Sequence, residues 1–181
     1  MQFPNKKYGV IYSDPPWSFN NFSKKGEKKN AKFHYECMDL DDMKAMACDL
    51  HGICKKDCVL FMWATFPMLP EAIELMKAWG FEYKTGAAWH KKTKHGKTAF
   101  GTGYIFRSAS ELLLVGTKGK PKPKNRSTRN IIEGKIREHS RKPDEVATMI
   151  ENLYDGEYFE MFSRTKREGW DVWGNQTDKF V

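Results

Sequence analysis

The chain has 181 residues, of which 40% are hydrophobic and 14% aromatic, enough for one packed globular domain. Its formal net charge of +8 and its pI near 9.2 favour a polyanionic partner, with nucleic acid as the leading candidate. No stretch approaches the roughly 20 apolar residues of a membrane helix, and no apolar signal segment follows the N-terminal lysines. We therefore expect a cytoplasmic protein with no membrane partner.

The predicted elements are typical of an α/β fold. Short apolar runs rich in β-branched and aromatic residues alternate with segments of helical periodicity, which indicates a mostly parallel sheet flanked by crossover helices. We predict strands at 8–12, 59–63, 83–89, 111–115 and 158–162. Helices are expected at 40–50, at 69–79 with Gly80 as the stop, and from Lys142 to about Leu153.

Three segments read as loops, at about 20–32, 91–103 and 117–130. The first and third are rich in Lys, Asn, Gly, Pro, Ser and Thr, and they cannot bury enough apolar area to order alone. Ligands bind at the carboxyl ends of strands in open α/β sheets, and we expect the loops to emerge mostly there. The whole of 1–181 is then one domain with basic loops as insertions.

The cysteines are read as reduced thiols. Cys37, Cys48, Cys54 and Cys58 cluster in one third of the chain, unlike a disulfide framework. His51 with the last two cysteines suggests zinc, but a structural zinc site needs four ligands and no second pair follows. We predict no metal site.

The tetrapeptide Asp14-Pro15-Pro16-Trp17 follows the first predicted strand. The N6 amine of adenine is a poor nucleophile, so its methylation needs acceptors directed at both N6 hydrogens. The Asp14 carboxylate and a Pro15 carbonyl fixed by the two prolines can supply them, while Trp17 offers a flat face for an extruded base. The same residues also make an ordinary turn with a packed tryptophan, and the tetrapeptide alone leaves both interpretations open.

Further motifs follow the tetrapeptide in a fixed order, and together they resemble the MT-A70 family of N6-adenine methyltransferases. The motifs are Tyr12-Ser13-Asp14-Pro15-Pro16-Trp17, Tyr35-Glu36-Cys37-Met38, Leu60-Phe61-Met62-Trp63, Trp79-Gly80-Phe81, Trp89-His90-Lys91, Glu111-Leu112-Leu113-Leu114-Val115-Gly116, His139-Ser140-Arg141-Lys142-Pro143-Asp144-Glu145, Glu160-Met161-Phe162-Ser163-Arg164 and Trp173-Gly174-Asn175-Gln176.

The resemblance implies a Rossmann-like, S-adenosylmethionine-dependent fold with permuted motif order, in which the catalytic tetrapeptide precedes the main cofactor strand. A Glu160 carboxylate at a strand end can accept hydrogen bonds from ribose hydroxyls, and Lys142 and Arg164 can meet the methionine carboxylate. From the residues alone, these cations could equally be solvated and the segment 175–176 a turn. The cofactor set that the resemblance implies is Asp14, Lys142, Glu160, Arg164, Asn175 and Gln176.

The resemblance also implies that Tyr35, Trp89 and Lys91 bind the substrate adenine, although ordinary core or rim packing explains such residues as well. The chain departs from the family at Lys166-Arg167, where a His-Asn pair is frequent, and this bears on the adenosine contacts of that loop.

The expected activity is methyl transfer from S-adenosyl-L-methionine to adenine N6 in nucleic acid. Such an enzyme flips its base from a duplex or takes a single strand, and cationic loops can hold the phosphates. Without a helix-turn-helix or zinc-finger motif, we expect short or relaxed sequence specificity. DNA is favoured over RNA because compact members of the family are typical of bacteria and phages. An RNA N6-adenine methyltransferase and a catalytically inactive nucleic-acid-binding subunit remain alternatives, and a homodimer is compatible with the sequence.

Overall fold

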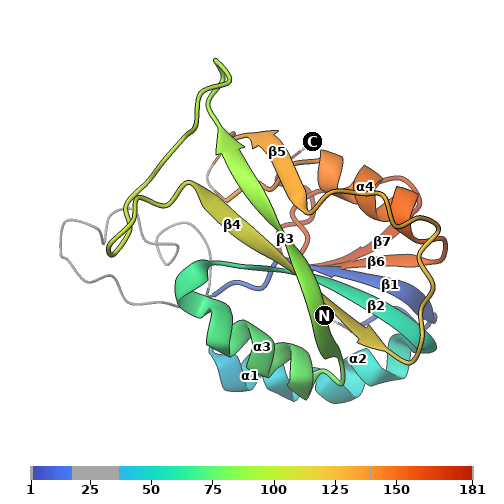
Figure 1. The fold of residues 1–181 in the computed structure, drawn as a ribbon. Helices are drawn as coiled ribbons and strands as arrows, with labels where there is room; N and C mark the ends of the chain where they lie inside the picture. The colour runs from blue at the N-terminus through green and yellow to red at the C-terminus, as the bar shows by residue number, and fades with distance from the viewer. Residues whose placement is uncertain (1, 18–36, 139, 181) are drawn as a thin grey trace.

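The computed structural model describes residues 2–17, 37–138 and 140–180. Within these ranges one seven-stranded sheet is flanked by helices (Figure 1). No described helix is long and apolar enough to cross a membrane. The elements in chain order are β1 Tyr8–Ser13, α1 Leu40–Ala45, α2 Ala47–Ile53, β2 Cys54–Ala64, η3 Phe66–Met68, α3 Leu69–Ala78, β3 Glu82–Lys92, β4 Ser110–Lys118, β5 Ile131–Lys135, α4 Glu145–Leu153, β6 Tyr158–Met161 and β7 Trp170–Trp173.

The sheet has the strand order β5-β3-β4-β2-β1-β6-β7. β1 pairs in parallel with β2 and β6, and β6 with β7 and β3 with β5 are also parallel. β4 pairs antiparallel with both β2 and β3, so it alone among the described strands runs against the others. The predicted α/β fold with a mostly parallel sheet is confirmed. The reversed β4 brings its first residues to the edge where the other strands end.

Helices cover both faces of the sheet (Figure 1). On one face, Met43 of α1 and Leu75 and Met76 of α3 pack against the buried side chains of β1 and β2. A Cβ placed on Gly116 of β4 would lie 2.5 Å from the Met76 sulfur, so this glycine lets α3 approach the sheet closely. α4 packs on the opposite face. The two cores hold β1, β2 and β6 rigidly, and the carboxyl ends of these strands carry the site.

The predicted strands are all present, but several boundaries differ. The helix predicted at 40–50 divides at Met46 into α1 and α2, and α2 passes into β2 at Cys54 without a loop. Gly80 follows α3 with a φ of 82°, as expected of a helix stop. β5 and β7 were not predicted. Both are short strands at the outer edges of the sheet, where a single neighbour supplies their hydrogen bonds.

The helix expected from Lys142 begins at Glu145. Asp144 precedes its first turn, and the Asp144 carboxylate pairs with Arg137 at 2.5 Å instead of capping the helix. Lys142 therefore lies in the preceding loop. From there its side chain reaches the end of β1, where its ammonium lies 2.9 Å from the Asp14 carboxylate.

The prediction that the basic loops emerge mostly at the carboxyl ends is wrong for the segment 117–130. Because β4 is antiparallel, this segment starts and ends at the opposite edge, where Figure 1 shows it on the far side from the loop between β3 and β4. The Lys120 amide donates to Asp57 at 2.7 Å, and the Lys124 amide donates to the Leu153 carbonyl at 2.7 Å. The predicted loop 20–32 lies outside the described residues.

Candidate active site

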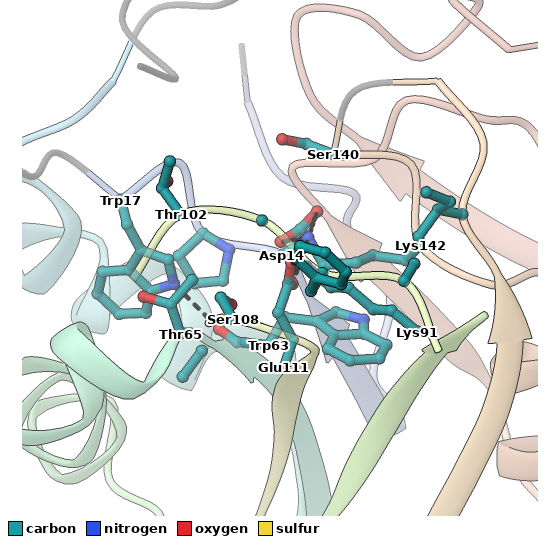
Figure 2. Close-up of a pocket in the computed structure, with 16 residues that line it drawn as sticks. Asp14, Trp17, Trp63, Thr65, Lys91, Thr102, Ser108, Glu111, Ser140 and Lys142 are labelled. Atoms are coloured by element: carbon teal, nitrogen blue, oxygen red, sulfur yellow. Dashed lines mark hydrogen bonds and ion pairs between the residues drawn. The ribbon is translucent and has the colours of Figure 1, made fainter. Parts of the chain in front are cut away.

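A cavity of about 360 Å³ opens where β1, β2 and β3 end and β4 begins (Figure 2). In Figure 2, Lys91 and Lys142 reach toward Glu111 and Asp14 from one side, and Trp17 lies on the other. The lining residues are Asp14, Pro15, Trp17, Trp63, Ala64, Thr65, Lys91, Ala99, Phe100, Gly101, Thr102, Ser108, Glu111, Ile136, Ser140 and Lys142.

Asp14 is held at the end of β1 by charged neighbours. The Lys142 ammonium lies 2.9 and 3.0 Å from the two carboxylate oxygens of Asp14, and one of these oxygens is 3.8 Å from the Arg164 guanidinium. The Asp14 side chain is 24% exposed, so it keeps access to the cavity while its position is fixed. The structure thus brings together three residues that are separate in the sequence.

The rest of the tetrapeptide forms a tight, hydrogen-bonded turn. The Pro15 carbonyl accepts the Trp17 amide at 2.8 Å, and the Pro16 carbonyl accepts the Met38 amide at 3.1 Å. The Trp17 indole is buried and donates to the Trp63 carbonyl at 3.0 Å, although Trp17 also lines the cavity. Pro15 therefore offers only the second lone pair of its carbonyl to a ligand, and Pro16 anchors the turn from outside the cavity lining.

Glu111 is a site residue that sequence reasoning missed. Its carboxylate lies 2.6 Å from the Lys91 ammonium and 3.3 Å from that of Lys142. Burial opposes ionisation, but the attraction of Lys142 and Lys91 outweighs it and lowers the pKa of Glu111. Charges of alternating sign thus follow one another across the site, in the order Arg164, Asp14, Lys142, Glu111 and Lys91. We call these five residues the ion network.

Two tryptophans support the lysines of this network. The Lys142 ammonium lies 5.6 Å from the Trp63 ring centroid, and the Lys91 ammonium 5.2 Å from that of Trp89. Trp89 is buried, donates to the Gly134 carbonyl at 2.9 Å and packs edge-on against Trp63. Trp89 lies behind Lys91 in the core and is not among the residues lining the described cavity, and its role at the adenine pocket stays a prediction.

Glu160 lines a second, smaller cavity of about 40 Å³ on the other side of Asp14. Its side chain is buried, and its Oε2 has no hydrogen-bond partner among the described residues. Burial raises the pKa of Glu160 to about 7, against the opposing attraction of Arg167. Asp14, Lys142 and Arg164 also line this cavity, so the Asp14–Lys142 pair forms a wall shared by both cavities.

Phe180 narrows the smaller cavity. Its ring centroid lies 4.9 Å from the Arg141 guanidinium carbon and 5.2 Å from that of Arg164.

The predicted cofactor residues Asn175 and Gln176 lie in the turn after β7 and outside the lining of the two cavities. This turn is tied to the end of β6, because the Ser163 amide donates to the Trp173 carbonyl at 3.0 Å. The predicted substrate residue Tyr35 lies outside the described residues.

The backbone is locally strained beside both cavities. Ser140 lines the larger cavity and Phe162 the smaller one, and each has a φ of 58°. They are the only non-glycine residues with positive φ in the described ranges. Such conformations cost free energy and persist where surrounding contacts enforce them, often at functional sites.

The fold and this site define a class. A mostly parallel sheet carries Asp14 at the end of β1, and the adjacent strand β6, which follows much later in the chain, carries Glu160. This is the Rossmann-like arrangement of methyltransferases with permuted motif order.

Comparisons with known proteins agree. The MT-A70 family model matches residues 8–176. The Type II methyltransferase M.MunI of Mycoplasma sp is 35% identical over 191 residues, covering 96% of this chain and 79% of that protein. The putative N(6)-adenosine-methyltransferase MT-A70-like of Medicago truncatula is 30% identical, covering 94% of this chain and 26% of that protein. The human N(6)-adenosine-methyltransferase catalytic subunit METTL3 is 28% identical, covering 95% of this chain and 28% of that protein. This chain belongs to the MT-A70 family of N6-adenine methyltransferases.

Proposed function

We propose that this chain transfers the methyl group of S-adenosyl-L-methionine to N6 of adenine in DNA, with short or relaxed sequence specificity, in the cytoplasm of a bacterial or phage-infected cell. The observation that carries the proposal is the position of Asp14. Its carboxylate lies on the wall shared by the two cavities. One is open enough for a base, and the other holds a buried carboxyl oxygen that has no hydrogen-bond partner among the described residues.

The adenine amine belongs in the larger cavity in this proposal. The Asp14 carboxylate accepts one N6 hydrogen and the remaining lone pair of the Pro15 carbonyl accepts the other, which turns the nitrogen lone pair toward the incoming methyl group. Lys142, paired with both Asp14 and Glu111, keeps the carboxylate from rotating away. The fixed negative charge of Asp14 also stabilises the positive charge that would develop on N6 as the nitrogen–methyl bond forms and the sulfur–methyl bond breaks. The surplus N6 proton would then leave to solvent.

The smaller cavity suits the cofactor, which when bound supplies an electrophilic methyl group on a sulfonium. Glu160 Oε2 has the acceptor capacity that ribose hydroxyls require. Since Lys142 already contacts two carboxylates of the chain, we assign the methionine carboxylate to Arg164. We expect the Phe180 ring to move on binding, because about 40 Å³ is well below the roughly 300 Å³ of ordinary ligand sites. Asn175 and Gln176 stay proposed contacts from the adjoining turn.

The substrate side of the site is proposed on the same grounds. Trp17 and Trp63 line the larger cavity, and Lys91 adds a positive charge at its wall. Tyr35 stays a predicted contact. DNA is favoured over RNA by the similarity to M.MunI, of which this chain spans 79%, against about a quarter of the plant and human N(6)-adenosine-methyltransferases.

The test uses S-adenosylmethionine with a labelled methyl group and adenine-containing oligonucleotides, both DNA and RNA, single- and double-stranded. We expect label in DNA, recovered as N6-methyladenine after digestion to nucleosides. Faster transfer to RNA would reassign the substrate. Cofactor binding by calorimetry without transfer to any oligonucleotide would support the inactive-subunit alternative, and absence of both would contradict the methyltransferase assignment.

A further inference from the structure

The loop between β3 and β4 carries the most exposed large apolar side chains among the described residues. Phe100, Tyr104, Ile105 and Phe106 are 70%, 83%, 78% and 85% exposed, whereas the other exposed large hydrophobic side chains lie between 37% and 57%. Apolar groups gathered on a surface in this way mark an interaction site. We call residues 104–106 the apolar tip.

The backbone holds this loop firmly at its base. The Ala99 amide donates to the Lys91 carbonyl at 2.8 Å, and the Gly101 amide donates to the Ser108 carbonyl at 2.8 Å. Within the loop, a Cβ on Gly103 would lie 1.8 Å from the Phe106 carbonyl oxygen, so only glycine permits this turn. The tip therefore projects from a fixed neck, and Figure 1 shows the loop extending beyond the sheet.

The base of the loop is part of the larger cavity. Phe100, Gly101, Thr102 and Ser108 all line it, and Figure 2 shows Thr102 and Ser108 beside the cavity. Ile105 is three residues from Thr102, and each residue spans at most about 3.5 Å. The apolar tip thus lies within about 10 Å, along the chain, of the cavity that we assign to the target base.

Positive charge flanks the apolar tip in the sequence. Arg107 follows the tip directly, and the turn that connects β3 to the loop carries Lys94 and Lys97. Cations that hold phosphates together with apolar side chains inserted between bases are the combination by which proteins unstack and kink a duplex. This charge favours a nucleic acid as the occupant of the surface.

We propose that Ile105 and Phe106 enter the base stack of duplex DNA beside the target adenine and occupy the space that it leaves when it turns into the cavity. The inference rests on the proposed function, because it requires adenine in a duplex as the substrate. A base that leaves the stack exposes apolar faces of its neighbours, and the two side chains cover them. A single strand has no such gap, so the tip serves duplex substrates selectively.

The test compares the wild-type protein with the double variant Ile105→Ser/Phe106→Ser and the control Ile131→Ser, which removes an exposed isoleucine at the start of β5, outside the loop. kcat/KM is measured on single-stranded and duplex DNA of one sequence. We expect the double variant to lose about 10-fold on the duplex and to stay within about twofold on the single strand. The control stays within about twofold on both.

Other outcomes would contradict the insertion of Ile105 and Phe106 into the base stack. Unchanged duplex activity, or an equal loss on both substrates, would overturn it. A lower association state of the double variant in sedimentation would make the tip an interface between copies and overturn it as well. If the wild type methylates no DNA, the proposed function fails. The insertion of Ile105 and Phe106 is then tested separately, by the fluorescence of duplexes that carry 2-aminopurine in place of adenine. The wild type raises their fluorescence and the double variant does not; no rise with the wild type would overturn the proposal.

Discussion

The two edges of the sheet carry lysines and carboxylates in different settings. At the carboxyl edge, the side chains of the ion network are only 13–24% exposed and alternate in sign. At the opposite edge, Lys124 and Asp155 form a pair with side chains 39% and 79% exposed. Exposed pairs contribute about 0–1 kcal/mol, whereas a buried charge that loses its partner is costly. Burial, not residue type, therefore distinguishes the charged pairs of the candidate site from those of the opposite edge.

The largest effect is expected at Asp14. Asp14→Asn keeps the shape of the side chain but removes its charge and turns one acceptor into a donor facing N6. We expect transfer to fall by about 10³-fold, with DNA affinity within a few-fold, measured by single-turnover methylation and by anisotropy. The matched control is Asp155→Asn at the opposite edge, which should keep wild-type rates. An Asp14→Asn variant with more than about a tenth of wild-type transfer would contradict the role of the Asp14 carboxylate in the reaction.

Glu111 tests whether the ion network is energetically coupled. Glu111→Gln removes the carboxylate that pairs with Lys91 and leaves Lys142 with Asp14 alone, so we expect a loss of about 2–4 kcal/mol in the free energy of unfolding in urea. The control is Glu133→Gln, whose carboxylate is 63% exposed and lies 3.1 Å from Lys92. It should change stability by less than about 1 kcal/mol. Equal losses in the two variants would mean that burial does not distinguish the Glu111 pairs from the exposed Glu133 pair.

Glu160 predicts a pH dependence of cofactor binding. With a pKa of about 7, its ionised fraction rises about 10-fold between pH 6 and pH 8. If the carboxylate accepts the ribose hydroxyls, calorimetry should show S-adenosylmethionine binding tighter by up to about 10-fold over this range, and Glu160→Gln should remove the dependence. A flat profile for the wild type would exclude this role.

The same group affects stability with a definite sign. The pKa of Glu160 in the folded chain lies above its usual value of 4.5, so the folded state binds more protons between pH 4.5 and about 7. This contribution is complete below pH 4.5 and is lost as the pH rises through 7, by about 3 kcal/mol. Glu160→Gln should therefore be more stable than the wild type at pH 8 in denaturant unfolding, although it binds cofactor more weakly.

The smallest effect is expected from the basic segment at the opposite edge. Replacing Lys120, Lys122 and Arg126 by Ser should weaken DNA binding by only a few-fold, equally for all sequences, and reduce its salt dependence. kcat should not change, because this edge is roughly 20 Å from Asp14, the length of the six residue steps of β2 between Cys58 and Ala64. A large loss of kcat would show that the two edges act together.

Much of the site was predictable because its residues lie at strand ends that the sequence marks clearly. Asp14 follows a buried apolar strand and two prolines, and Lys142 and Arg164 belong to motifs of the family. The structure places all three within one ion network. Glu111 was missed because a β4 parallel to its neighbours would place this residue, the second of the strand, at the wrong edge. Only the pairing with β2 and β3 reveals the reversed direction.

The same reversal explains the misplaced loop 117–130. A strand's direction is set by long-range pairing and leaves no mark in local hydrophobic periodicity. β5 and β7 escaped prediction because segments of five and four residues at the sheet edges have too little periodicity to stand out. Trp89 could be assigned to a strand, but whether its ring faces the cavity or the core depends on its contacts with Trp63 and Gly134.

We expect the carboxyl edge to bind the cofactor beside Asp14. Amide hydrogen exchange with and without S-adenosylhomocysteine, the product left after transfer, tests it most directly. We expect the ligand to slow exchange in peptides covering 11–17, 140–144 and 160–166, with no change in 119–130. Protection confined to 119–130, or none around Asp14 and Glu160, would contradict the account.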